Sequence, residues 1–123
     1  MNVAIIGASP KPDRYANKAM HKLTEAGHSV YLVHHIHKEI EGHPVFASLK
    51  DITVQIDTIT VYINATKSNE IMDEIIAAAP KRIILNPGAE NDKLQRAAES
   101  KGIKVKHACT LVMLATNTFL EKL

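Results

Sequence analysis

The sequence has little of what several protein classes require. Its 123 residues include one cysteine, no tryptophan and only 4% aromatic residues. One cysteine excludes an internal disulfide, and the scarcity of aromatic side chains argues against a stacking platform for single-stranded nucleic acid. No apolar run approaches the roughly 20 residues of a membrane-spanning helix, so we expect no membrane contact.

Charge of one sign is not in excess either. Fifteen Lys and Arg face 13 Asp and Glu, a net charge of +2 that does not favour general nucleic-acid binding. Hydrophobic residues make up 46% and charged residues 23%, as in an ordinary folded domain, so we expect residues 1–123 to form one domain. The chain passes from Met1 directly into an apolar segment with no basic leader, which predicts a cytoplasmic protein.

What the sequence does contain is an alternation of short apolar runs and helical patterns. The expected strands are Val3–Ile6, Val30–Val33, Thr58–Ile63, Arg82–Leu85 and Ile103–Val105. Continuous apolar runs are typical of strands covered on both faces. Between the runs, apolar residues recur at helical spacing. The alternation predicts a doubly wound α/β fold, with about five parallel strands and helices on both faces.

The ends of the helices carry recognisable signals. Asp13 is expected to cap the first helix, Ser68 a central helix, and Asn91 or Asp92 the next. A last helix is expected to begin near Thr110 and continue through Leu120. The polar segment His34–Pro44 is expected to be an exposed crossover.

Ligands of open parallel sheets bind at the carboxyl ends of the strands, so the loops that leave those ends are the candidate site. The first loop contains Gly7, Ala8, Ser9, Lys11 and Arg14. Glycine permits a sharp turn, the small residues can leave amides open, and a following helix favours an anion. These features indicate a phosphate cradle, although neither Gly-Lys-Ser/Thr nor Gly-x-Gly-x-x-Gly is present. The alternative is a strand-to-helix turn without a ligand.

The end of the second strand narrows the choice of nucleotide. Domains that bind NAD usually place an acidic residue there for the ribose hydroxyls. This chain has Val33-His34-His35 instead. One interpretation is that a histidine at this place accommodates a phosphate of the ligand. The alternative is that His34 and His35 are simply solvated loop residues.

Several motifs in order resemble the small CoA-binding proteins, which are similar to the CoA-binding domain of the succinyl-CoA synthetase alpha subunit. The motifs are Gly7 to Arg14, Glu39-Ile40-Glu41-Gly42, Pro44-Val45-Phe46, Ser48 to Ile52, Asn86 to Asn91, and Ala108 to Leu114. They span nearly the whole chain. The resemblance implies a Rossmann-like fold that holds CoA at the strand ends.

The resemblance also implies which residues contact the ligand. Around the phosphates it places Gly7, Ala8, Ser9, Pro10, Lys11 and Arg14. It places Val33 and His34 near the adenosine, and Ile63, Asn64 and Ser68 beside the nucleotide. It places Asn86, Pro87 and Gly88 along the pantetheine. Relatives often have Val-Asn-Pro where this chain has Val33-His34-His35, so the adenosine contacts depart from the pattern.

Two further residue types invite a functional interpretation. Cys109 precedes a helix start, where a thiol can become reactive, but free cysteines are more often buried, and the sequence favours burial. His34, His35, His37 and His43 lie close in sequence without cysteine or carboxylate partners at ligand spacing, so we expect no dedicated metal site.

No catalytic constellation stands out, and we identify no catalytic residue. The sequence predicts a protein that binds CoA or an acyl-CoA without independent catalysis. The alternatives are an NAD(P)-binding, oxidoreductase-like domain and an interaction protein with a vestigial nucleotide cleft. The last helix is apolar on more than one face, which predicts burial and, as a sharper hypothesis, a homodimer contact; the sequence names no protein partner.

Overall fold

The computed structural model describes residues 1–120, in which seven strands form one sheet in the order β3-β4-β2-β1-β5-β6-β7. The strands are β1 (Asn2–Ile6), β2 (Ser29–Val33), β3 (Glu39–Ile40), β4 (His43–Phe46), β5 (Thr58–Val61), β6 (Arg82–Leu85) and β7 (Lys104–His107). The helices are α1 (Tyr15–Glu25), α2 (Ala65–Glu70), α3 (Met72–Ala77), α4 (Asp92–Glu99) and α5 (Thr110–Ala115), with a short 3₁₀ turn at Leu49–Asp51.

The expected α/β architecture is confirmed. Strands β4, β2, β1, β5, β6 and β7 run parallel to their neighbours, and the chain fills the sheet outward from β1 in both directions. This is the strand order of a Rossmann-like fold, in which the winding direction reverses between β1 and β5. No helix in the described part of the chain combines the length and apolarity that crossing a membrane requires.

The sheet has two more strands than the expected five, because the segment His34–Pro44 is not a plain crossover. It contains β3, which pairs antiparallel with the start of β4. Glu41 and Gly42, the two residues of the connecting turn, both have positive φ, at 50° and 82°. A two-residue turn of this kind matches the twist of a hairpin, and β4 continues into parallel pairing with β2.

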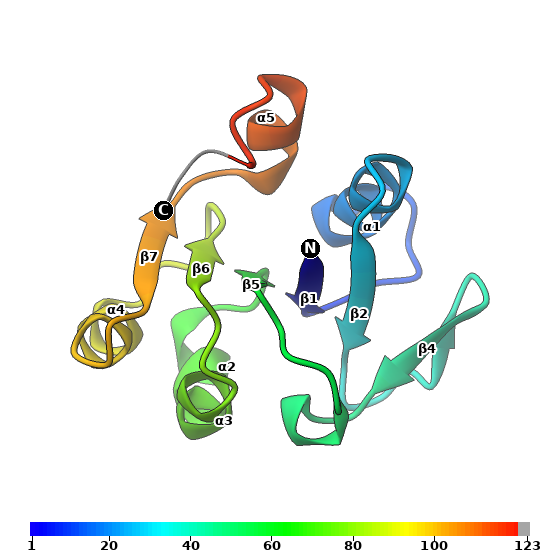
Figure 1. Ribbon diagram of the computed structural model, residues 1–123. Coiled ribbons are helices and arrows are strands. Elements are labelled where there is room, and N and C mark those ends of the chain that lie inside the picture. The colour runs from blue at the N-terminus through cyan, green and yellow to red at the C-terminus, as the bar shows by residue number, and fades with distance from the viewer. Residues whose placement is uncertain (121–123) are drawn as a thin grey trace.

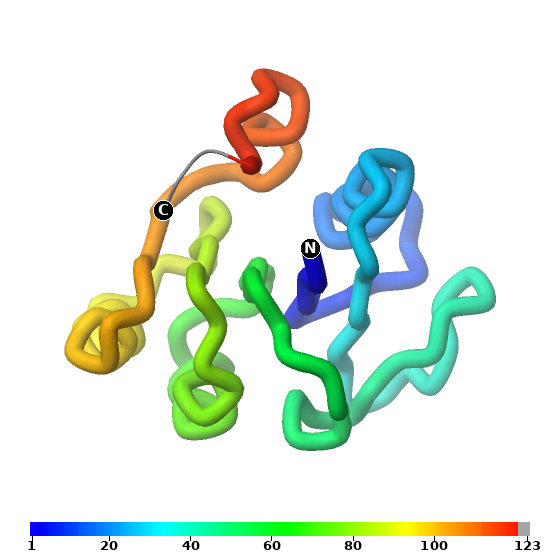
Figure 2. Tube along the Cα trace, in the orientation of Figure 1, coloured from blue at the N-terminus to red at the C-terminus, as the bar shows by residue number. Residues whose placement is uncertain are grey.

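Helices cover both faces of the sheet, as Figure 1 and the tube in Figure 2 show. Alternate residues of each strand point to opposite faces, which divides the core in two. Val3 and Ile5 pack with residues of α1 and α5 on one face. Ala4 and Ile6 face the other side, where Ile75 of α3 and Leu94 of α4 are buried.

Three expected helix ends are wrong. Arg14, not Asp13, occupies the N-cap of α1, and its side chain makes no capping hydrogen bond. Asn64 caps α2 through a 3.0 Å hydrogen bond from the Lys67 amide, so Ser68 lies inside that helix. The last helix ends at Ala115 instead of Leu120. Of the two expected caps for α4, Asn91 and Asp92, the structure shows Asn91, whose side chain accepts a 3.0 Å hydrogen bond from the Leu94 amide.

Arg82 enters the core at the amino end of β6, although a charged residue there would ordinarily face solvent. It is only 2% exposed. Its Nη1 donates to the Phe119 carbonyl at 2.8 Å, and its Nε and Nη2 donate to the Thr58 hydroxyl. The guanidinium also lies 4.5 Å from the centre of the Phe119 ring. Burial lowers the pKa of Arg82, and these contacts tie the turn after α5 to the sheet.

Gly7, directly after β1, allows two parts of the sheet edge to approach closely. Its φ is +89°, and a Cβ there would lie 2.9 Å from Ile63 Cγ2. We expect Gly7→Ala to lower the free energy of unfolding by about 3 kcal/mol, from backbone strain and overpacking together. Urea unfolding monitored by circular dichroism measures the loss.

Gly102→Ala is the matched control for that substitution. Gly102 has a φ of +80°, but a Cβ there would meet no heavy atom within 4 Å. Only the backbone strain remains, so we expect a loss of about 1–2 kcal/mol. Equal losses in the two variants would show that the contact with Ile63 contributes nothing.

Candidate functional site

The winding reversal places the ends of β1, β2 and β5 side by side. Ile6 at the end of β1 pairs with Val33 of β2 on one side and with Val61 of β5 on the other. The chain then leaves β1 for α1 on one face and β5 for α2 on the opposite face. Open α/β sheets bind ligands at such a point, because the two departing loops leave space between them.

The first loop turns at Gly7 and is held by one carbonyl group. The amides of Gly7 and Ala8 both donate to the Val33 carbonyl oxygen, at 3.1 and 3.3 Å. The expectation that the Ala8 amide stays open is therefore wrong. The side chain of Ala8 is buried against the core of the α1 face. Gly7 and Ala8 therefore fix the position of the loop. Any contact with an anion must come from the residues that follow them.

The following residues present donor groups and positive charge. The Ser9 hydroxyl oxygen accepts a 3.2 Å hydrogen bond from the Lys11 amide, which leaves its own O–H hydrogen free to donate. Pro10, Lys11 and Arg14 are exposed, and neither Lys11 nor Arg14 forms a salt bridge with any residue in the described range 1–120. Both cations thus lie unpaired beside the N-terminus of α1, where the helix dipole also favours an anion.

A buried polar residue that sequence reasoning missed supports this loop. Asn17 is 2% exposed, and its side-chain amide donates to the Ser9 carbonyl at 3.0 Å and to Glu41 Oε2 at 2.8 Å. Glu41 also pairs with His21 at 3.1 Å. The hydrogen bond from Asn17, followed by the charge of His21, lowers the pKa of Glu41. The signal in the sequence is a polar residue on the apolar stripe of a helix.

At the end of β2, Val33 is buried and His34 is half-buried. The His34 amide donates to the Phe46 carbonyl at 3.0 Å, which continues the pairing with β4. The His34 ring stacks on His35, with centroids 4.9 Å apart, and lies 4.5 Å from His37. No group of three metal-ligating side chains that could hold an ion occurs among residues 1–120.

The loop after β5 gives a mixed result for the expected contacts. Ile63 lies against Gly7, and Asn64 is exposed at the start of α2. Ser68 is fully buried, and its hydroxyl accepts a 2.7 Å hydrogen bond from Asn91. The Ser68 hydroxyl therefore joins α2 to the N-cap of α4 and is already occupied by a protein partner.

The loop after β6 contains a buried polar junction. Asn86 is 1% exposed and donates to the Thr60 hydroxyl at 2.7 Å and to the Val61 carbonyl at 2.9 Å. It accepts a 2.9 Å hydrogen bond from the Thr110 amide. Asn86 therefore joins β5, β6 and α5. It supports the loop, while its exposed neighbours Pro87 and Gly88 form the surface.

The surface of this loop already carries an anion. The Gly88 amide donates to both carboxylate oxygens of Glu90, at 3.0 and 3.1 Å. Hydrogen bonds from the backbone of Glu90 and Gly88 lower the pKa of that carboxyl group. A second anion would be repelled here, so this loop suits an uncharged part of a ligand.

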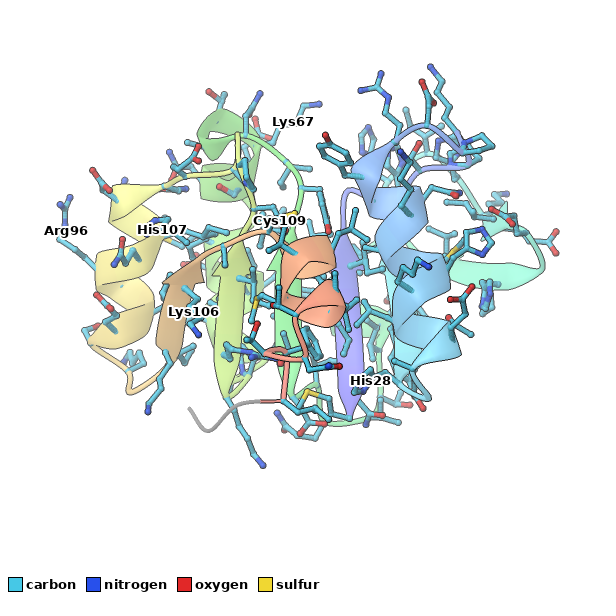
Figure 3. All side chains as sticks on the ribbon, turned by 90° about the horizontal axis from the view of Figure 1, so that it is seen from above. His28, Lys67, Arg96, Lys106, His107 and Cys109 are labelled. Atoms are coloured by element: carbon cyan, nitrogen blue, oxygen red, sulfur yellow. The ribbon has the colours of Figure 1, made fainter. Side chains whose placement is uncertain are left out.

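Two further groups follow or precede elements near the strand ends: Tyr62 directly after β5 and Cys109 directly before α5. Tyr62 has a buried hydroxyl with no hydrogen-bond partner in the described residues, and burial raises the pKa of Tyr62 to about 12. Cys109, expected to be buried, is half-buried at the N-cap of α5. Figure 3 shows Cys109, His107 and Lys67 toward one end of the strands and His28 toward the other.

A separate hollow of about 760 Å³ lies between α1 and α5, beside the helices and not over the strand ends. Leu111 and Leu114 line it on α5, and Lys18, His21 and Lys22 line it on α1. Pro12 connects this hollow to the first loop. This hollow therefore also carries cationic side chains, but it lies beside the helices and not at the strand ends, where open α/β sheets bind their ligands.

Known proteins are similar to this chain in sequence and in fold. A crystal structure of an uncharacterised protein superposes with a TM-score of 0.89 at 34% sequence identity, covering 96% of this chain and 97% of that one. The uncharacterised protein YneT of Bacillus subtilis is 25% identical over 116 residues, which are 88% of this chain and 86% of YneT.

An acetate–CoA ligase (ADP-forming) of Archaeoglobus fulgidus is 29% identical over 128 aligned positions. The match covers 93% of this chain but only 18% of the ligase, so the chain corresponds to one part of that enzyme. The family model described as CoA binding domain matches residues 1–115. With the fold, the strand-end loops and this match over nearly the whole sequence in agreement, the chain belongs to the CoA binding domain family.

Proposed function

We propose that this protein binds CoA or an acyl-CoA across the ends of β1, β2 and β5, without catalysis of its own. The pyrophosphate contacts the Ser9 hydroxyl, Lys11 and Arg14. The adenosine lies toward Val33 and His34, and the pantetheine passes Ile63 toward Pro87 and Gly88. The observation that carries the proposal is the pair of exposed, unpaired cations beside a free hydroxyl donor at the winding reversal.

The distribution of charge at the strand ends favours one orientation of the bound ligand. Positive side chains lie along the first loop, whereas Glu90 occupies the amide of Gly88 in the loop after β6. A molecule with phosphates at one end and an uncharged arm at the other matches this polarity. CoA has that form, and a compact nucleotide triphosphate does not.

The residues of the strand ends fit the NAD(P)-binding alternative less well than they fit CoA binding. An NAD-binding domain would use an acidic residue after β2, and both NAD and NADP domains would use two further glycines in the first loop; this chain has neither feature. The residues at the strand ends also support binding without catalysis. Among the described residues, neither Ser9 nor Cys109 is hydrogen-bonded to a side chain that could act as its general base. The cytoplasmic location stays a prediction.

Calorimetric titration tests the binding directly. We expect CoA to release or absorb heat in the titration and to raise the melting temperature of the protein in a separate thermal unfolding measurement. ATP and NADP should bind much more weakly. Lys11→Ala is expected to weaken CoA binding about tenfold, because a charge-assisted hydrogen bond to phosphate contributes about 1.5 kcal/mol or more. The free energy of unfolding should stay unchanged, since Lys11 is exposed.

Lys101→Ala is the matched control, because Lys101 is equally exposed but lies beyond α4. This variant should bind CoA as the parent does. No binding of CoA by the parent protein would contradict the proposed function. Equal affinity in the Lys11 and Lys101 variants would contradict only the phosphate role of Lys11.

The expected homodimer contact lies on α5. Val112 on this helix is 57% exposed and Leu120 beyond it is 67% exposed, while Met113 and Phe119 are buried in the core. Light scattering at on the order of 50 µM protein is expected to give twice the 13.5 kDa chain mass, with Val112→Glu reducing it to one chain. A monomeric mass for the parent would end this part of the proposal.

A further inference from the structure

Three histidines form a compact cluster at the end of β2. His34, His35 and His37, named here the histidine cluster, follow Val33 within four residues. The rings of His34 and His35 are nearly parallel, with an interplanar angle of 9° and centroids 4.9 Å apart. His37 contacts the same His34 ring, with centroids 4.5 Å apart. Imidazoles this close influence one another's protonation.

The backbone fixes the central ring of the cluster. The Ile36 amide donates to His34 Nδ1 at 3.0 Å, so Nδ1 is an acceptor and the neutral ring carries its proton on Nε2. His34 can therefore donate from Nε2 without gaining a charge. His35 is exposed and His37 is half-buried.

Positive charge surrounds this ring without a compensating acid. Burial, then the charges of His37, His35 and Lys67, lower the pKa of His34. Lys67 belongs to α2, on the other side of the winding reversal (Figure 3). None of these four side chains forms a salt bridge with a described residue. Protonating the His34 ring is therefore unfavourable in the absence of an anion.

The cluster lies where open α/β sheets recognise the ribose of a nucleotide. Val33, just before it, holds the phosphate loop through the hydrogen bonds from Gly7 and Ala8. An acidic residue at this place binds ribose hydroxyls, whereas a cation accommodates a phosphate on the ribose. This chain has imidazoles and a lysine here, and no acidic residue until Glu39.

We propose that the histidine cluster and Lys67 bind a phosphate monoester on the ribose of the bound nucleotide, with uptake of protons on binding. This inference rests on the proposed function, in which the ligand is CoA with its ribose 3′-phosphate. NADP, with a ribose 2′-phosphate, carries the same chemical group. His34 donates from Nε2, and protonated His35 and His37 supply charge together with Lys67.

The direction of the pH dependence follows from linkage. A phosphate dianion favours the protonated form of each imidazole, so the complex holds more protons than the separate molecules. Affinity for the monoester must then fall as the pH rises from 6 through the histidine range, about 6.5 in model peptides. Below about pH 6 the phosphate itself takes up a proton, and the affinity stops rising.

Calorimetric titration of the full chain with CoA and 3′-dephospho-CoA at pH 6 and pH 8 tests the proposal. We expect CoA to bind about tenfold more weakly at pH 8 than at pH 6, and dephospho-CoA to change less than about threefold. An additional titration at pH 7, carried out in two buffers of different ionisation enthalpy, measures the protons taken up. Uptake is expected with CoA and not with dephospho-CoA.

Variants assign the effect to named side chains. His35→Gln combined with His37→Gln should abolish most of the proton uptake and most of the preference for CoA, without changing the affinity for dephospho-CoA. Both residues lie outside the core, and the folded state of the variant is checked by circular dichroism. His43→Gln on β4 is the control and should behave as the parent does, because His43 makes no ring contact with the cluster.

The outcomes separate this inference from the proposed function. Equal affinities for CoA and dephospho-CoA, or CoA binding without proton uptake, overturn the inference and leave CoA binding in place. Proton-linked binding of NADP but not of CoA supports the cluster and overturns the CoA assignment. If neither CoA nor NADP binds at either pH, both proposals are wrong.

Discussion

The arrangement of the strand ends at the winding reversal depends on one group, the carbonyl oxygen of Val33. It accepts the amides of both Gly7 and Ala8, so the end of β2 fixes the direction in which the chain leaves β1. Gly7 makes this possible, because its positive φ and missing side chain let the loop pass against Ile63. These contacts bring the first loop (Gly7 to Arg14), the histidine cluster and the loop after β5 to one place.

Long-range polar side chains then hold the surrounding loops in position. Asn17 joins the Ser9 backbone to Glu41 in the β3–β4 turn, and Asn86 joins β5, β6 and the start of α5. A buried amide that satisfies two or three partners costs little to desolvate and restricts the backbone around it. These buried hydrogen bonds thus fix the loops to which the exposed residues Lys11, Arg14 and Gly88 belong.

Much of the fold could be predicted from local patterns. Each of the five apolar runs corresponds to a strand, and the helical spacing between them corresponds to helices. These elements could be predicted because burial on both faces and helix periodicity determine which residue types occur at which spacing. The misplaced cap at Ser68 has a physical reason. Serine suits a helix end, but here its hydroxyl pairs with Asn91 of α4, a partner 23 positions away that no local pattern indicates.

The sequence by itself determined the α/β class, the glycine turn after the first strand and the residue types at the strand ends, since these depend on near neighbours along the chain. Only the tertiary structure decided which polar groups stay free. The amide of Ala8, the hydroxyl of Ser68 and the side chain of Asn86 are all occupied by distant partners. The Ser9 hydroxyl hydrogen and the ammonium groups of Lys11 and Lys67, in contrast, have no partner among residues 1–120. Hydrogen-bond satisfaction is a property of contacts between strands and helices, and those contacts exist only after folding.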